Sequence, residues 1–216
     1  RDVLGSRGLG DVYKEDDIQS DGLTHSSIWC IVKDNQGTLW LGTYFGGVNY
    51  FNPEYEIYTR YSYSSNEKQG LSNPVVGRTI EDKNGNLWIG TEGGGLNYFN
   101  RRTREFKWYR PQEGRNSISH NNVKALYYDA DKEIIWIGTH LGGLNRLDIR
   151  SGHFTHYRME DNNRQTLPSD IVRDIIPYKD LLIVATQNGV CLFDPDSGKC
   201  RQLFKDSKEG KSIKMV

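Results

Sequence analysis

Short runs of apolar and aromatic residues recur along the chain at a fixed interval. The first run of each unit covers residues 28–32, 76–80, 123–127 or 171–176, and it is rich in β-branched and aromatic side chains. Such runs, bounded by turn residues, are typical of β-strands. Because no stretch keeps an apolar stripe with helical periodicity over three turns, we expect no long helix. The pattern therefore predicts an all-β protein.

A second run in each unit carries a five-residue phrase, Leu/Ile-Trp-Leu/Ile-Gly-Thr. The phrase recurs every 48 residues, and its tryptophan is Trp40, Trp88 or Trp136. A fourth, divergent version at residues 182–186 has no tryptophan. Residues 34–37, before the first phrase, read Asp-Asn-Gln-Gly. They favour a hairpin turn, because Asp and Asn bond to the local backbone and Gly tolerates positive φ.

A glycine-rich corner, a third apolar run and an aromatic fourth run complete each unit. The corners read Gly-Gly-Val-Asn at residues 46–49 and Gly-Gly-Leu-Asn at residues 94–97 and 142–145. Four strands in a repeat of about 45 residues form the blade of a β-propeller. We therefore predict an all-β fold, namely a β-propeller fragment of about four four-stranded blades that belongs to a larger propeller.

The repeat also predicts where the blades begin and end. We expect three blades at residues 25–66, 67–115 and 116–165, and a degenerate fourth blade at residues 166–207. Two shorter segments flank them. Residues 1–24 are similar to the end of a preceding blade with its connector, and residues 208–216 are similar to the start of a following blade.

The repeated tryptophans are expected to be structural. A blade must pack on its neighbours to bury its faces, and one tryptophan buries on the order of 200 Å². We expect Trp40, Trp88 and Trp136 to pack blade against blade, and the alternative is a platform on which a sugar ring stacks. Trp29 and Trp108 lie outside the repeated position and are freer candidates for ligand contact.

Charge and cysteine content narrow the function classes. The chain has 28 basic and 28 acidic residues and a pI of about 7.1, so it lacks the basic footprint of a nucleic-acid-binding protein and we expect no direct membrane contact. Three cysteines give no disulfide framework. A bridge between Cys191 and Cys200 would join diagonal positions of a hairpin, which suits disulfide geometry poorly; the alternative is that both are small buried apolar residues.

The sequence offers few signals of catalysis or metal binding. The glycines at residues 90–95 join strand to strand and lack the helix N-terminus of a phosphate loop. Among the five histidines only His153 and His156 are closely spaced, and no third ligand lies near them in the sequence. We therefore expect no catalytic residue, no metal and no cofactor in this chain.

The combined motif, Ile-x-x-Ile-x-x-Asp-x-x-Gly-x-Leu-Trp-Ile-Gly-Thr followed by Gly-Gly-Leu-Asn, resembles the two-component regulator propeller repeat. Residues 28–52, 76–100 and 123–148 match it, and residues 171–194 match it in part. The resemblance implies the sensor portion of a membrane-spanning histidine kinase, often a hybrid kinase that detects glycan fragments. It implies that the module is periplasmic and is part of an inner-membrane receptor. In such a receptor an Ig-like domain, a membrane helix and a kinase follow the propeller along the chain.

The sequence thus favours a ligand-sensing, glycan-sensing module that is itself not an enzyme. The implied partners are the remaining blades, the downstream receptor domains, an oligosaccharide and a second copy in a homodimer. The alternatives are a propeller enzyme, such as a lyase or glycosidase, and a purely structural interaction scaffold.

The loops between second and third strands are the candidate ligand surface. In up-and-down blades these loops share one face with the connectors between blades, and the opposite face, with its Asp/Asn/Gly turns, is expected to be free of ligand. Repeat positions 44, 92, 140 and 187 differ in chemistry while their surroundings repeat, as expected when fold is constant and site is individual. The alternative is that they are solvated loop residues. The candidate ligand-binding residues are Tyr44, Phe45, Glu92, His140, Gln187, His120 and Asn121.

Overall fold

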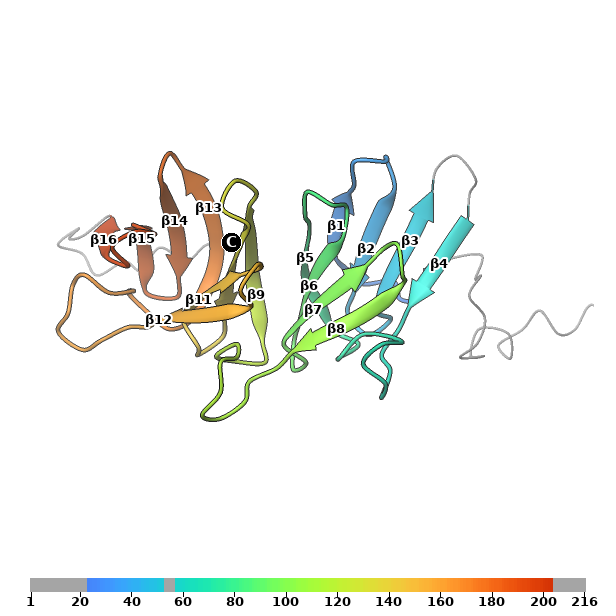
Figure 1. Cartoon of the computed structure of the whole chain (residues 1–216), viewed down its shortest axis with the longest axis horizontal. Coiled ribbons are helices and arrows are strands. Elements are labelled where there is room, and N and C mark those ends of the chain that lie inside the picture. Colours follow the sequence, from blue (N-terminus) through green and yellow to red (C-terminus); the bar gives the residue numbers. More distant parts are fainter. Residues whose placement is uncertain (1–22, 53–56, 204–216) are drawn as a thin grey trace, which may run out of the picture.

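The computed structural model describes residues 23–52 and 57–203, which form four antiparallel sheets of four strands each (Figure 1). The first sheet contains β1 (Ile28–Lys33), β2 (Leu39–Thr43), β3 (Val48–Asn52) and β4 (Ile57–Tyr61). The second contains β5 (Val76–Glu81), β6 (Leu87–Thr91), β7 (Leu96–Asn100) and β8 (Glu105–Tyr109). The third contains β9 (Val123–Asp129), β10 (Ile134–Thr139), β11 (Leu144–Asp148) and β12 (His153–Tyr157). The fourth contains β13 (Val172–Tyr178), β14 (Leu181–Thr186), β15 (Gly189–Phe193) and β16 (Cys200–Leu203).

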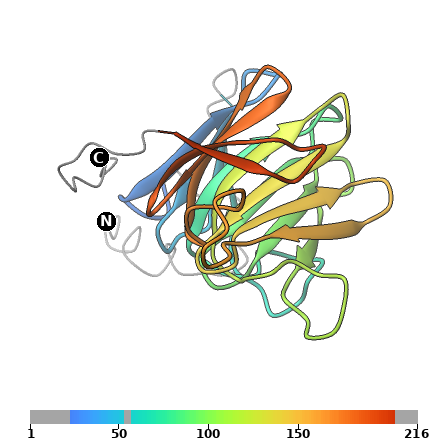
Figure 2. The ribbon, with the colours of Figure 1, turned by 90° about the vertical axis from the view of Figure 1, so that its left-hand side faces the viewer.

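The sheets are arranged as successive blades of a β-propeller. Strands follow one another in chain order within every sheet. The first strands of the four sheets lie side by side in the order β1, β5, β9 and β13, toward the middle of the molecule. The last strands β4 and β16 lie toward its outside (Figure 1). Turned by 90°, the sheets are seen stacked side by side (Figure 2). The all-β, four-bladed prediction is therefore confirmed. The flanking segments expected at residues 1–24 and 208–216 lie outside the described residues, apart from residues 23 and 24.

Each repeated tryptophan is buried between its own sheet and the next one. Trp40 shares a core cluster with Leu87, Ile89 and Phe99 of the second sheet. In the same way, Trp88 packs among side chains of the third sheet and Trp136 among those of the fourth. The apolar core of the molecule thus consists of three junctions between neighbouring sheets.

Two glycines of the repeat are dictated by close approach of other atoms. The second glycine of the corner has positive φ in the first three sheets, and a Cβ on Gly95 would lie 2.2 Å from the carbonyl oxygen of Tyr109. The glycine of the tryptophan phrase meets the neighbouring sheet, since a Cβ on Gly90 would lie 2.5 Å from Val123 Cγ1. The fourth sheet has Ala185 at this position.

The asparagine that ends each corner fastens the incoming connector. Asn97 is fully buried, and its Oδ1 accepts a hydrogen bond of 2.8 Å from the Ser72 N–H. Asn145 accepts in the same way from the Ser119 N–H at 2.8 Å. The fourth sheet has Cys191 at this position, and its Sγ lies 3.3 Å from that of Cys200. Both thiols are free and buried, and strand pairing places the two residues diagonally.

Candidate functional site

A β-bulge interrupts the first strand of every sheet at the same place. In the first sheet Ile28 pairs with Thr43 and Cys30 with Gly42, so that Trp29 is the extra residue. The extra residues of the other sheets are Gly77, Lys124 and Arg173. Bulges re-aim a side chain and are common at the rims of barrels and beside functional sites. The first, third and fourth sheets therefore each turn one side chain of the innermost strand at this end of the molecule, whereas the second sheet has a glycine there.

The loops between second and third strands meet these bulges through a repeated backbone contact. In each sheet one loop N–H donates to a carbonyl just before the first strand. The four bonds are Tyr44 to Ser27 at 3.1 Å, Glu92 to Val75 at 3.0 Å, His140 to Asn122 at 3.0 Å and Gln187 to Ile171 at 2.9 Å. The structure thus places the four variable candidates at equivalent positions of the four sheets, all at one end of the molecule.

The connectors that lead into the first strands also share a local turn. A side chain accepts a hydrogen bond from the backbone N–H two residues later in every connector. The four acceptors are His25 Nδ1, Asn73 Oδ1, His120 Nδ1 and Ser169 Oγ, at 2.9–3.1 Å. Because Nδ1 accepts this bond, His25 and His120 carry their proton on Nε2 when neutral, and the turn fixes the ring beside the loop.

The first sheet carries an aromatic group at this end. Trp29 and Tyr44 are stacked with ring centroids 4.8 Å apart, and Phe45 meets Tyr44 edge to face at 4.3 Å. His25 lies 6.3 Å from the Tyr44 ring. Trp29 and Phe45 remain 43% and 56% exposed, so their faces are open to a ligand. Aromatic faces of this kind suit the C–H face of a sugar ring.

The other three sheets carry polar groups at the same end. Glu92 accepts from Lys124 Nζ, which joins the loop of the second sheet to the bulge of the third. In the fourth sheet Arg173 of the bulge donates to Gln187 Oε1 at 3.5 Å. The backbone of Asn121 holds the corner of the second sheet, since its main-chain carbonyl accepts a hydrogen bond from the Gly95 N–H at 2.7 Å.

Two histidines face each other beside the third sheet, His120 on the connector before β9 and His140 on the loop after β10. The His120 and His140 rings are 6.3 Å apart in an edge-to-face arrangement, and His140 Nδ1 is buried without a hydrogen-bond partner among the described residues. Partial burial lowers the pKa of His120 below its ordinary value, and the nearby His140 and Arg158 lower this pKa further. His120 is therefore a neutral imidazole near pH 7.

All seven candidate residues gather at one end of the sheets, but they form separate groups, one for each sheet. Within the described ranges, the side-chain contact that joins two of these groups is that of Glu92 with Lys124. Sequence reasoning missed the bulge residues Lys124 and Arg173, and it singled out Trp29 without placing it in the bulge. Strand alternation could not find them, because a bulge shifts the register without leaving a fixed residue type in the sequence.

The residues that the structure describes show no group of three or more His, Cys, Asp or Glu side chains placed to hold a metal ion. Within residues 23–52 and 57–203 there is also no helical segment with the length and apolar character of a membrane span.

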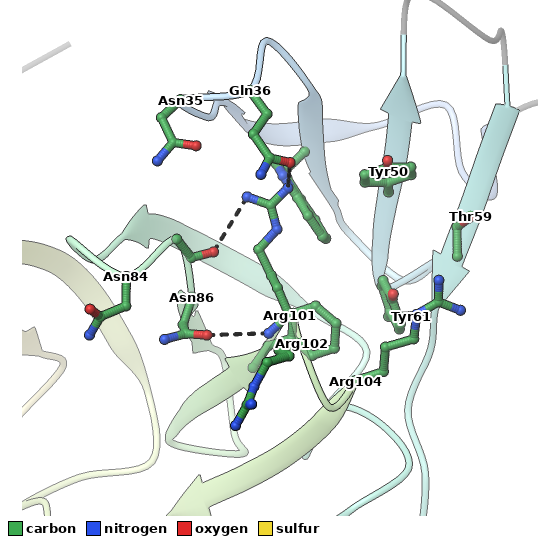
Figure 3. Close-up of a pocket in the computed structure, with 13 residues that line it drawn as sticks. Asn35, Gln36, Tyr50, Thr59, Tyr61, Asn84, Asn86, Arg101, Arg102 and Arg104 are labelled. Carbon is green, nitrogen blue, oxygen red and sulfur yellow. Dashed lines mark hydrogen bonds between the residues drawn. The ribbon is translucent and has the colours of Figure 1, made fainter.

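A pocket of about 440 Å³ lies at the opposite end, between the first and second sheets (Figure 3). Its wall combines aromatic side chains of β2, β3, β4 and β7 with the turns at residues 35–36, 84–86 and 101–104. None of the seven candidate residues lines it. The pocket thus opens on the face that the sequence-based hypothesis left without a ligand.

The sequence matches the family described as two component regulator propeller in three separate segments, residues 22–45, 70–93 and 117–140. These segments coincide with the connector, first strand and tryptophan phrase of the first three sheets. A search of curated proteins finds no match.

Several solved structures share the fold. The extracellular domain assigned to hybrid two component system BT3049 of B. thetaiotaomicron is 25% identical, with a TM-score of 0.73 over 86% of this chain. The extracellular domain of BT4673 from the same organism is 23% identical, with a TM-score of 0.71 over 87% of this chain. PorZ, a surface component of the type-IX secretion system of Porphyromonas gingivalis, is 21% identical, with a TM-score of 0.62 over 88% of this chain.

The chain spans only about a quarter of the length of these solved structures, namely 25%, 26% and 29%. At identities below 25%, the second and third show a common fold alone. Family segments and fold agree on the repeat, because each matched segment contains the repeated tryptophan of one junction between sheets. The chain therefore contains three two component regulator propeller repeats, and it is similar over most of its length to an extracellular domain of a two-component system.

Proposed function

We propose that this chain is part of the extracytoplasmic, ligand-sensing region of a two-component receptor in the inner membrane, and that it works within a larger propeller. Family and fold similarity support a sensor module. In this proposal the chain binds the ligand and transmits the signal of binding, and the receptor's downstream kinase performs the enzymatic step.

The ligand face of this proposal is the end with the bulges and the loops at Tyr44, Glu92, His140 and Gln187. The observation that carries it is the repeated backbone bond at these four positions, which holds four chemically different side chains in one register. A constant frame with variable side chains is how repeat proteins build individual sites.

The proposed ligand class is an oligosaccharide. The exposed faces of Trp29 and Phe45 can stack on sugar rings. Glu92, Gln187 and the His140 imidazole, from other sheets, supply acceptors and donors for hydroxyl groups. A ligand that touches several sheets would couple their relative positions, which is the kind of event a receptor can transmit.

The test is calorimetry on the full chain with a panel of neutral and acidic oligosaccharides. We expect Tyr44→Ala and His140→Ala each to weaken the binding of the responding sugar by about tenfold, the scale of a contact worth more than 1 kcal/mol. Tyr178→Ala is the matched control, because Tyr178 is 47% exposed but lies at the far end of β13.

Unchanged affinity in both variants, with folding intact, would remove this face from the proposal. Turnover of a sugar in the same panel would favour the alternative of a propeller enzyme. Absence of binding to every sugar would favour a purely structural interaction scaffold.

A further inference from the structure

We propose that the pocket between the first and second sheets is a second binding site, and that it takes a hydroxylated organic anion of about monosaccharide size, with Arg104 as its anion-binding residue. The pocket is lined by the turns between first and second strands at residues 35–36 and 84–86, which lie at the end of the sheets opposite the loops of the proposed sugar face. The proposal therefore stands or falls independently of that face, and it departs from the expectation that this end is free of ligand.

Arg101 forms the floor of the pocket and is already satisfied. Its Nη2 lies 2.8 Å from Asp34 Oδ2 and 3.0 Å from Gln36 Oε1, and its Nη1 lies 3.3 Å from Glu81 Oε1. Its guanidinium also covers the Trp40 ring at 5.2 Å. Arg101 thus fastens the second sheet to the first, and its charge is balanced by two carboxylates.

Arg104 differs from Arg101, because no ion pair or hydrogen bond of its side chain is found among the described residues. Its side chain extends toward Tyr61 and Thr59 of β4, across the open space of the pocket (Figure 3). The charge of Arg104 also acts on the Tyr61 hydroxyl, whose pKa is raised mainly by burial and is lowered in part by this arginine. The Arg104 guanidinium therefore faces the pocket from one wall, with no partner among residues 23–52 and 57–203.

The backbone at Arg104 is held in a conformation that its sister repeats give to glycine. Arg104 has a φ of 58°, and the matching residues of the third and fourth sheets are Gly152 and Gly198, both at 70°. The turn is the same in all three, since each N–H donates to the carbonyl four residues earlier at 2.8–2.9 Å. A non-glycine residue is strained in this region of backbone conformation. Strain of this kind, at a position where glycine is the ordinary choice, points to a use for the side chain.

The other two junctions have different residues at the same place. The residue that matches Arg101 is Ile149 at the second junction, where it packs against the cluster that contains Trp88. At the third junction the match is Pro195, and the space there is only about 180 Å³. Arg150, which matches Arg102, is paired with Glu133. Among the three junctions that the structure describes, an open pocket beside an arginine with no described partner is thus a feature of the first junction and not of the repeat.

The lining defines the chemistry of the ligand. A guanidinium binds a carboxylate or sulfate through charge-assisted hydrogen bonds. The amides of Asn35, Asn84 and Asn86 and the hydroxyl of Thr59 can bind hydroxyl groups, and the faces of Tyr50 and Tyr61 can cover a ring. A carboxylated sugar combines these features in one small molecule.

Arg104→Gly is the decisive variant because it separates binding from stability. It converts the turn to the residue found in the sister repeats, so we expect a melting temperature equal to or above that of the wild type. We also expect calorimetry on the full chain to show glucuronate binding that is about tenfold weaker or more, as when one charged hydrogen bond is lost. Glucose tests the need for charge and inorganic sulfate tests the need for hydroxyls.

Lys179→Gly is the matched control. Lys179 has a φ of 55° in a turn of the fourth sheet, so that this change also removes one positive charge and one strained residue. We expect it to leave glucuronate binding unchanged. The proposal is overturned if the wild type does not bind glucuronate, if glucose binds equally well, or if folded Arg104→Gly binds glucuronate like the wild type. A lowered melting temperature of Arg104→Gly would assign the arginine a structural role instead.

Discussion

Asp34 shows how much a single turn residue does in this repeat. Its Oδ1 accepts from the N–H groups of Gln36 and Thr38, and its Oδ2 accepts from Trp40 Nε1 at 2.8 Å and from Arg101. The buried indole would otherwise have lost its water partner without replacement. One carboxylate therefore links a turn, a core tryptophan and the neighbouring sheet.

We predict that Asp34→Ala lowers the free energy of unfolding by about 2–4 kcal/mol, because buried donors and a largely buried arginine lose their acceptor. Asp82 is the matched position, since it accepts from Trp88 Nε1 at 3.3 Å but contacts no described arginine. Asp82→Ala should cost less. Urea unfolding measures both, and equal losses would show that Arg101 adds nothing to the first junction.

The lowered pKa of His120 leads us to predict that the stability of the fold depends on pH. Its pKa in the folded state lies below the ordinary value of 6.5, mainly through burial, so the unfolded chain binds the proton more readily. The stability due to neutral His120 is complete above about pH 6.5 and is lost as the pH falls through the lowered pKa. Protonation would also remove the bond that Nδ1 accepts from Asn122.

His120→Asn should keep the turn and abolish this dependence, because Asn73 forms the same turn at the matching position. The measurement is the free energy of unfolding of both proteins between pH 7.5 and pH 5. A wild-type loss no larger than that of the variant would contradict the prediction.

At the scale of elements, the glycine corner decides how each second strand turns into the third. We predict that Gly95→Ala is markedly more destabilising than Gly114→Ala. Both residues have positive φ, but a Cβ on Gly95 would lie 2.2 Å from a backbone oxygen, whereas none lies within 4 Å of a Cβ on Gly114. Gly114→Ala should cost about 1 kcal/mol for the backbone alone, and Gly95→Ala should add about 1–3 kcal/mol of overpacking. Thermal or urea unfolding distinguishes them, and similar losses would mean that the corner relaxes freely.

At the scale of the whole molecule, the sheets form a one-dimensional array in which each core lies at a junction. We predict that Trp88→Ala, at the middle junction, lowers stability by about 3–5 kcal/mol and makes urea unfolding less cooperative, because the two halves then unfold separately. Trp29→Ala is the control, since Trp29 is 43% exposed and belongs to no junction core. A single transition with an unchanged urea dependence in Trp88→Ala would contradict the prediction.

The sequence alone determined the repeat and, through it, the fold. A 48-residue period fixed the strand order, and the tryptophans, corner glycines and turn residues marked each strand, because these positions meet the same local and neighbouring atoms in every unit. It also placed the loops at positions 44, 92, 140 and 187 in one register, since alternation of strand direction follows from short connections.

Only the tertiary structure decided which side chains meet. The bulges that turn Trp29, Lys124 and Arg173 leave no residue-type signal, and the contact of Lys124 with Glu92 joins residues of different sheets. The pocket at Arg104 depends on the packing of two sheets and on one strained φ, and neither is visible in a pattern of apolar and polar residues. A repeat fixes what is common to its units, whereas a site arises where the units differ and touch.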